Sequence, residues 1–212
     1  MAGTSNPSIL NGKPDELFYF AYGSNMNKEQ ISARCAKAKV VAVAKLSDFQ
    51  LAFFGHSVVW DGAEETVVPS PSHDVWGVVY QLSASDQERL DDAQGARLDG
   101  SGPYFHFPAT VTAADGSSYS VLLFKKDSLG RRLKPSQEYL SFIAQGAADR
   151  ELPAAYVEAL RTMESAKAKY TVPRANKSVR EFPSGGDCSQ CGDTPAAPSK
   201  VINISLGSED RS

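Results

Sequence analysis

The fold is decided by one stretch near the N-terminus, Phe18-Tyr19-Phe20-Ala21-Tyr22-Gly23-Ser24-Asn25-Met26. Its first four residues are apolar or aromatic, and they predict a short buried strand over Leu17–Ala21. The residues that follow, Tyr22–Asn25, are typical of a turn, because Gly23 allows a close approach between backbone segments. The stretch therefore predicts a strand that ends abruptly in a turn.

A helix is predicted directly after this turn, over Met26–Lys39, with Ser24 and Asn25 as its capping residues. A buried strand, a turn and a helix start together present free backbone N–H groups, which can receive a carboxylate or another oxyanion. A purely structural turn with a helix cap has the same pattern, so the residues alone leave both interpretations open.

Composition limits the class of protein. The chain has 212 residues, a net charge of -3 and three cysteines. This length fits one domain with additional terminal segments. Without a dense Lys/Arg stripe we expect no nucleic-acid partner, and three scattered cysteines exclude a disulfide framework. No signal-peptide pattern or long apolar run is seen, so we expect a soluble cytoplasmic protein with no membrane partner.

Three regions are predicted along the chain. Residues 1–16 have no helical or strand period and indicate a flexible arm, 17–169 form the folded domain, and 170–212 are rich in Pro, Gly and Ser. This tail is expected to be extended or disordered. Its Cys188-Ser189-Gln190-Cys191 segment is half of a zinc-ribbon pattern; we interpret it as two incidental thiols, with a redox pair as the alternative. The Asn-x-Ser sequences at Asn176 and Asn203 carry little weight as glycosylation sites.

Short apolar or alternating runs predict six further strands, at 40–46, 48–54, 66–68, 75–82, 104–112 and 118–125. The run at 75–82 is apolar on both faces and is expected to be central. The last two strands form a hairpin around Asp115-Gly116. The stretch Gly55–Ser72 contains prolines and glycine, and apart from 66–68 it is predicted to be irregular.

Three more helices are predicted, at 83–94, 136–145 and 153–167. In the first, Ser85 and Glu88 have capping-box spacing, and Gly95 is a normal C-terminal glycine. Strands that come first, with helices inserted and appended, indicate an α+β domain. Several short strands with turn signals indicate a small barrel.

The opening stretch also resembles a known signature. Phe20–Met26 is similar to the FAYGSN signature of the γ-glutamylcyclotransferase-like family, and further segments resemble that family in the same order: Asp74–Tyr80, Ser136–Tyr139, Gly146-Ala147 and Leu152–Tyr156. The resemblance covers roughly residues 18 to 160. It implies an α+β fold, a small mixed β-barrel with flanking helices, and often a homodimer.

The activity that the resemblance implies is an intramolecular cyclisation. The free α-amine of a γ-glutamyl group attacks its own γ-carbonyl, 5-oxoproline forms, and the amine that was joined to the γ-carbonyl leaves. The reactants are already tethered, so the substrate itself supplies much of the proximity. The small-molecule substrate would be a γ-glutamyl amine, amino acid, peptide or glutathione-derived conjugate.

The resemblance also assigns site residues. The loop that would bind the γ-glutamyl group consists of Tyr22, Gly23, Ser24, Asn25 and Met26. Tyr104 and Tyr139 match family tyrosines near the substrate, while core packing with a satisfied hydroxyl is the structural alternative for both. We expect no cofactor and no metal, since the chain's three histidines, His56, His73 and His106, lack metal-ligand spacing.

One position departs from the family pattern. The family's glutamate general acid/base lies in a segment like L-D-x-x-E-G, and the matching segment Leu90–Gly95 has Gln94 at that position. An amide cannot take up a proton near neutral pH, and loss of a general acid–base typically costs about 10²–10⁴ in rate. Three explanations are open. Gln94 is an engineered Glu→Gln replacement, or the chain is a natural divergent member of the family. In the third, the carboxylate comes from Asp91, Asp92 or Asp99. Asp91 is the better-placed of the two helical aspartates, because it shares roughly the face of Gln94.

These alternatives lead to different functions. The first expectation is a γ-glutamylcyclotransferase, inactivated if Gln94 is a replacement. The others are a catalytically silent module that binds a γ-glutamyl-type ligand, and a divergent enzyme of the same fold. The identity of the leaving amine is not encoded in any motif of the sequence.

Overall fold

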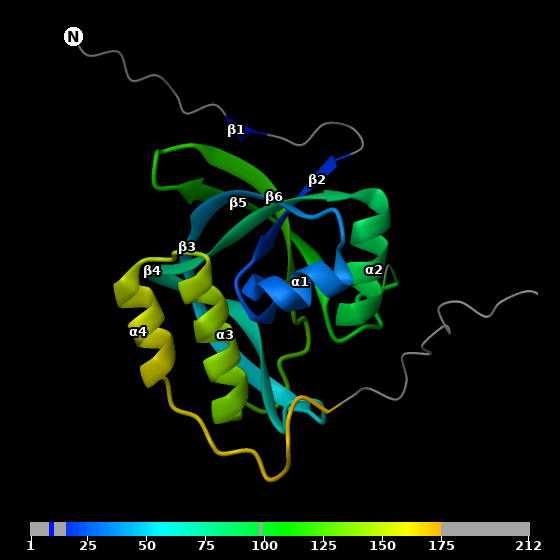
Figure 1. Cartoon of the computed structure of the whole chain (residues 1–212), viewed down its shortest axis with the longest axis vertical. Coiled ribbons are helices and arrows are strands. Elements are labelled where there is room, and N and C mark those ends of the chain that lie inside the picture. The colour runs from blue at the N-terminus through cyan, green and yellow to red at the C-terminus, as the bar shows by residue number, and fades with distance from the viewer. Residues whose placement is uncertain (1–8, 11–15, 98, 175–212) are drawn as a thin grey trace, which may run out of the picture. The chain divides into compact units, whose positions relative to one another are not determined.

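The computed structural model of the chain describes residues 9–10, 16–97 and 99–174. A closed barrel of five strands, β2 to β6, forms its centre, and four α-helices pack around it within the described residues (Figure 1). The elements in chain order are β1 (Ile9–Leu10), β2 (Glu16–Ala21), the 3-10 turn η1 (Ser24–Met26), α1 (Lys28–Arg34), β3 (Lys39–Ser57), β4 (Gly62–Ser83), α2 (Ala84–Gln94), β5 (Phe105–Ala113), β6 (Ser118–Lys125), α3 (Gln137–Asp149) and α4 (Ala154–Thr162). The α+β prediction of a small mixed barrel with flanking helices is confirmed.

The barrel closes in the strand order β6-β2-β4-β3-β5, with β5 returning to β6. Every neighbouring pair in the barrel is antiparallel except β2 and β6, which are parallel where Tyr19 faces Leu122. The short strand β1 adds to β6 in parallel, with Ile9 opposite Ser118. Strand pairing therefore reaches into the segment 1–16, which the sequence predicts to be a loose arm.

The hairpin of β3 and β4 is much longer than the sequence predicts. The predicted strands at 40–46 and 48–54 are one strand, because the register changes between the Ser47–Asp74 and Phe49–Pro69 pairs without ending it. At this point Asp48 of β3 has φ 63°, and the extra residues, 70–73, lie on β4. The prediction of an irregular stretch over Gly55–Ser72 is wrong, since β3 continues to Ser57 and β4 starts at Gly62. The prediction rested on Pro69 and Pro71, which are typical of loops. Both are exposed, where a missing backbone N–H is tolerated in a strand.

Strand β4 is central, as predicted for the run at 75–82. It pairs with β2 from Glu16 opposite Ser83 to Ala21 opposite Val78. Val75, Val78 and Val79 are fully buried. A Cβ atom at Gly77 would overlap the backbone oxygen of Ala21, so the end of β2 approaches β4 closely. This contact fixes the direction in which the chain leaves β2.

The predicted helix over Met26–Lys39 is shorter than expected. The chain first forms the turn η1, and α1 begins only at Lys28, because the Asn27 side chain accepts hydrogen bonds from the backbone N–H groups of Glu29 (3.0 Å) and Gln30 (3.2 Å). Asn27, and not Ser24 or Asn25, is thus the cap. The helix ends at Arg34, and Cys35 follows as its C-cap.

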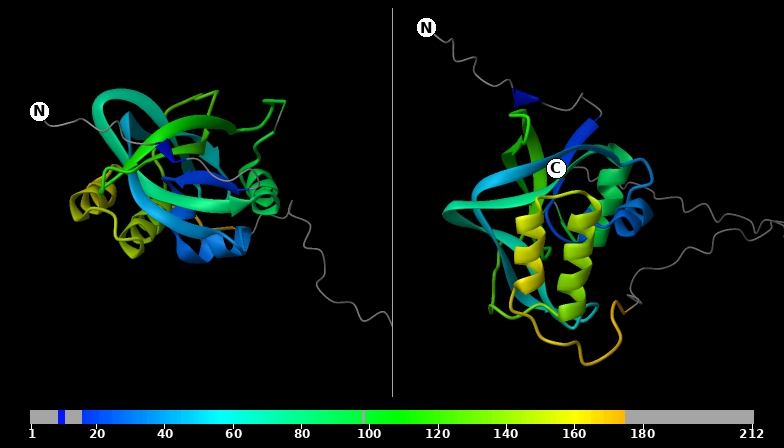
Figure 2. Two further views of the ribbon diagram at one scale, coloured as in Figure 1. Left: turned by 90° about the horizontal axis from the view of Figure 1, so that it is seen from above. Right: turned by 60° about the vertical axis from the view of Figure 1, so that its left-hand side comes forward.

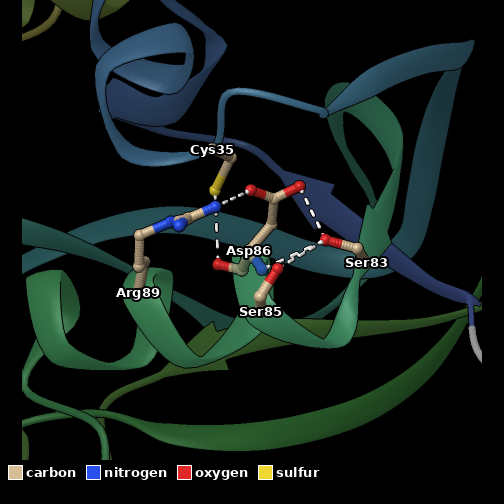
Figure 3. Close-up of polar contacts among 5 residues, drawn as sticks. All are labelled: Cys35, Ser83, Ser85, Asp86 and Arg89. Atoms are coloured by element: carbon tan, nitrogen blue, oxygen red, sulfur yellow. Dashed lines mark hydrogen bonds and ion pairs between the residues drawn. The ribbon is translucent and has the colours of Figure 1, made fainter.

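Helix α2 is capped by Ser83 instead of Ser85. Ser83 Oγ accepts a hydrogen bond from the backbone N–H of Asp86 (3.3 Å) and donates one to Asp86 Oδ2 (2.9 Å), as Figure 3 shows. The Asp86 carboxylate is fully buried and forms an ion pair with Arg89 at 2.5 Å. Gly95 ends the helix in the left-handed conformation (φ 64°), as predicted.

Helices α3 and α4 lie side by side and are joined by a short connection (Figure 2). Helix α3 begins after Ser136, whose hydroxyl accepts a hydrogen bond from the Tyr139 N–H at 3.2 Å. The predicted helix at 153–167 ends at Thr162, because the following residues are extended and Ala166 pairs with Ser136.

The first residues of the predicted tail contact the β3–β4 turn. Tyr170 Oη donates to the carbonyl of Val58 (2.7 Å), and the Arg174 N–H donates to that of Val59 (2.8 Å). The Cys188-Cys191 pair, Asn176 and Asn203 lie outside the described residues. Of the helices that the structure describes, none has the length and apolar character to cross a membrane.

Candidate active site

The loop that follows β2 is a tight buried turn. The Met26 N–H donates to the Gly23 carbonyl at 3.0 Å, and Ser24, Asn25 and Met26 are all buried. The Asn25 side chain holds the turn in place: its Nδ2 donates to Tyr19 Oη (2.9 Å), and its Oδ1 accepts from Arg34 (2.7 Å). The turn is therefore rigidly supported by its own strand and by helix α1.

A carboxylate lies against this turn. Glu65 of β4 is only 5% exposed, and its Oε1 accepts a hydrogen bond from the backbone N–H of Ser24 at 3.1 Å. The Ser24 hydroxyl lies 3.5 Å from the same oxygen. A Cβ atom at position 23 would overlap Oε1, Cδ and Cγ of Glu65, so glycine is required for this close approach. The junction that was predicted to receive an oxyanion thus contains one supplied by the chain itself.

Two tyrosines complete the surroundings of Glu65. Tyr139 Oη donates to Glu65 Oε2, and Tyr104 Oη donates to the backbone oxygen of Glu65 at 2.7 Å. The Tyr139 ring packs on Trp60, with centroids 4.6 Å apart, and the Ser136 cap fixes the start of its helix. The structure therefore gathers the predicted Tyr22–Met26 loop, Tyr104 and Tyr139 around a residue that the sequence did not single out.

These tyrosines remain neutral hydrogen-bond donors. Burial raises the pKa of Tyr139, Tyr104 and Tyr22 well above its ordinary value, and the nearby negative charge of Glu65 adds to the effect. The Tyr22 hydroxyl donates to the backbone oxygen of Phe124 and so points into the barrel. Met26 is fully buried and its carbonyl accepts from Arg150 at 3.2 Å, which makes its role structural in this conformation.

A positive charge lies beside Tyr104. The Lys126 ammonium is 4.2 Å from the centroid of the Tyr104 ring and 3.1 Å from the carboxylate of Glu64. The Lys126 side chain is largely buried, whereas that of Glu64 is about one-third exposed. Neighbouring carboxylates of β4 thus have different partners: Glu64 pairs with a lysine, and Glu65 with the N–H of Ser24 and the hydroxyl of Tyr139.

Gln94 is the half-buried last residue of α2. Its side chain takes part in none of the hydrogen bonds found among the described residues, and Gly95 next to it adopts the conformation of a helix C-terminus. The assignment of position 94 as that of the general acid/base stays a prediction.

The aspartates that could replace the missing glutamate have other partners. Asp91 lies 2.7 Å from His106 Nε2 and 2.5 Å from Gln87 Nε2, at the edge of a separate cavity of about 210 Å³. Asp92 is exposed. Asp99 is also exposed, and accepts a hydrogen bond from the Ser101 N–H at 2.9 Å. In the described part of the chain, none of these carboxylates is hydrogen-bonded to the Tyr22–Met26 loop.

Sequence reasoning missed Glu65 because it treated the surrounding segment as irregular. Once β4 is extended to Gly62, strand alternation places Ala63, Glu65 and Val67 on one face, and all three are buried. A charged residue between two buried small or apolar residues, two positions apart on each side, was the available signal. Elsewhere in the described residues, no group of three His, Cys, Asp or Glu side chains is arranged to hold a metal ion.

Comparison with known proteins gives the family. Residues 74–160 match the model of the AIG2-like family. A protein from Homo sapiens named γ-glutamylcyclotransferase is 32% identical over 171 residues, which cover 77% of this chain and 87% of that protein. A protein of the same name from Mus musculus is 35% identical over 72% of this chain and 82% of its own length.

A solved structure agrees with this similarity. A structure titled γ-glutamyl cyclotransferase superimposes with a TM-score of 0.69 at 32% identity, and covers 74% of this chain and 93% of its own. Both the barrel and the segments that build the loop and its tyrosines lie within the described residues. With this identity over most of both chains, the protein belongs to the γ-glutamylcyclotransferase family.

Proposed function

We propose that this chain is a γ-glutamylcyclotransferase that converts a γ-glutamyl amine or peptide into 5-oxoproline and the free amine. The similarity to proteins of that name over more than two-thirds of both chains carries the proposal. It is supported by the way in which the Tyr22–Met26 turn, Tyr104 and Tyr139 converge on one buried carboxylate.

In this proposal the γ-glutamyl group binds beside the Tyr22–Met26 turn. Gly23 allows the close approach of Glu65 to the turn. The neutral hydroxyls of Tyr104 and Tyr139, which donate to Glu65, line the wall of the site. The α-amine and the γ-carbonyl belong to one molecule, so the protein's task is to hold the glutamyl chain bent. It must also stabilise the oxyanion and move protons from the attacking nitrogen to the leaving one.

The amide at Gln94 favours one second candidate function. If the chain lacks a working proton carrier, it would bind a γ-glutamyl-type ligand without turning it over. A silent binding module of this kind keeps the fold and the loop, and differs from the enzyme only in the chemical step. An engineered Glu→Gln replacement at position 94 would give the same behaviour.

One experiment separates these possibilities. The full chain and its Gln94→Glu variant are incubated with γ-glutamyl dipeptides, γ-glutamyl amines and glutathione, and 5-oxoproline is followed by mass spectrometry. Turnover by the unchanged chain supports the enzyme, and turnover by the variant alone supports an inactivated form. Ligand binding by calorimetry without turnover from either supports the silent module. If neither product nor binding is observed with either protein, the cyclotransferase assignment is wrong.

A cytoplasmic setting and a homodimer are also part of the proposal. Both come from the sequence analysis. Light scattering after size exclusion tests the second, because a dimer of this 22.8 kDa chain has twice the monomer mass.

A further inference from the structure

Glu65 is a buried acid that the proposed function does not require. Its carboxylate is 5% exposed and accepts hydrogen bonds from the Ser24 N–H at 3.1 Å and from the Tyr139 hydroxyl. Burying a carboxylate is costly unless it is well paired, and here both oxygens have donors. Such a group at the predicted substrate loop calls for a role in the chemistry of that loop.

We propose that Glu65 is the proton carrier of the cyclisation, in place of the amide at position 94. This inference rests on the proposed function and names the group that makes it possible. Glu65 is the one carboxylate, among the described residues, that is hydrogen-bonded to the Tyr22–Met26 turn. Gln94 has no proton to exchange near neutral pH, and the nearby aspartates are paired elsewhere or exposed.

The charge of Glu65 also fits the substrate. A carboxylate at the turn attracts the α-ammonium group of a γ-glutamyl compound, and it can remove a proton from that group directly. Its partner Tyr139 stays protonated because burial raises the pKa of the phenol. Tyr139 therefore holds the carboxylate in position and does not compete with the substrate for the proton.

The proton count closes without a further reactant. The α-ammonium loses two protons in turn as its nitrogen forms the bond to the γ-carbon and becomes the lactam N–H. The bond from the γ-carbon to the leaving nitrogen breaks, and that nitrogen gains two protons as it becomes an ammonium ion. Glu65 takes up and returns one proton at a time, so it ends as the carboxylate that it was at the start.

The test compares Glu65→Gln with the unchanged chain. The amide keeps the size of the side chain, and its oxygen can still accept the hydrogen bond from the Ser24 N–H, while its NH2 group can donate to the Tyr139 hydroxyl. It cannot take up or release a proton near neutral pH. We expect 5-oxoproline formation to fall about 10²- to 10⁴-fold, with the circular dichroism spectrum unchanged. Glu64→Gln is the matched control, because its carboxylate pairs with Lys126; it should keep turnover within about threefold.

A rescue experiment separates proton transfer from a structural role. Glu65→Ala leaves a space of carboxylate size at the turn, and excess formate should restore part of the lost turnover, whereas chloride should not. A structural defect would not respond to a small carboxylic acid. If either variant is unfolded, Glu65→Asp distinguishes proton transfer from a structural role, because it keeps the acid and should retain measurable turnover.

The outcomes for the inference and for the proposed function are distinct. Turnover by the unchanged chain that Glu65→Gln leaves within threefold overturns the inference and leaves the proposed function standing. Turnover that appears only in Gln94→Glu also overturns it, because position 94 is then the required acid. Absence of both turnover and binding in every variant overturns the proposed function, and the inference with it.

Discussion

The carboxylate oxygen Oε1 of Glu65 lies 3.1 Å from the backbone nitrogen of Ser24, although the two residues are 41 positions apart in the sequence. This contact joins the turn after β2 to the first half of β4. The second half of β4 pairs with β2 itself, so one strand both orders the turn and supplies its acid. A rigid scaffold of this kind holds a functional carboxylate with little freedom.

The first prediction concerns Gly23, which faces Glu65. Gly23→Ala should destabilise the protein by about 1–3 kcal/mol, because the new Cβ overlaps the Glu65 side chain. The backbone at this position has φ −127° and ψ −139°, outside the left-handed region. In a Glu65→Ala background the same change should cost clearly less, because the overlapping atoms of the Glu65 side chain are absent. Urea unfolding of the four proteins of this double-mutant cycle provides the measurement.

Gly77→Ala is the control for this cycle. Its Cβ would overlap the backbone oxygen of Ala21 and the ring of Phe20, neither of which Glu65→Ala removes. The cost of Gly77→Ala should therefore be the same in both backgrounds. Equal costs of Gly23→Ala with and without Glu65 would show that the close contact in the structure is wrong.

The second prediction compares the two tyrosines. Tyr139→Phe removes a hydrogen bond to the charged group of Glu65, whereas Tyr104→Phe removes one to its backbone oxygen. Hydrogen bonds to charged groups contribute about 1.5–3 kcal/mol and neutral ones about 1 kcal/mol. We expect kcat/KM to fall about 10- to 100-fold for Tyr139→Phe and less for Tyr104→Phe. A larger loss for Tyr104→Phe would contradict this assignment of partners.

Much of this fold was predictable from local patterns, and the site was predictable in part. The Phe18–Met26 run and the apolar run at 75–82 fixed the strand, the turn and the central strand, because burial and turn chemistry agree there. Tyr104 and Tyr139 were found through the family resemblance. Glu65 was not, because its burial depends on a β3–β4 pairing that changes register opposite Asp48 and continues past two prolines of β4, and no short-range pattern encodes that pairing.

The third prediction concerns the buried acid at the start of α2. Burial opposes ionisation of Asp86, but its bonds to Arg89 and Ser83 outweigh this and hold its pKa below the ordinary value. Asp86→Asn should therefore lower the free energy of unfolding at pH 7 by about 1–3 kcal/mol. Ser85→Ala is the control, since Ser85 is exposed and, among the described residues, its hydroxyl is hydrogen-bonded only to that of Ser83 (Figure 3). It should change stability by less than about 0.5 kcal/mol.

The pH dependence of this effect has a defined sign. The pKa of Asp86 is lower in the folded than in the unfolded chain. Its contribution to the free energy of unfolding is therefore fully present above the unfolded pKa of about 4. That contribution is lost as the pH falls through the folded pKa. The gap between the unchanged chain and Asp86→Asn should therefore narrow in acid, as followed by urea unfolding from pH 7 downward. A difference in the free energy of unfolding that widens in acid would show that the pKa of Asp86 is raised in the folded chain, not lowered.

The last prediction concerns Cys35, which contacts the same helix end. Burial raises the pKa of its thiol to about 11, the negative charge of Asp86 adds to the effect, and the Sγ atom lies 3.5 Å from the Asp86 carbonyl oxygen. At pH 8 only about one thiol in a thousand is then ionised, and the thiolate is the reactive form. Iodoacetamide should leave Cys35 unlabelled in the folded chain and label it in urea, as read by peptide mass spectrometry.

Asp86→Asn removes the nearby charge and should speed the labelling of Cys35, whereas Ser85→Ala should not. Rapid labelling of Cys35 in the unchanged folded chain would show that the thiol is neither buried nor held in its neutral form.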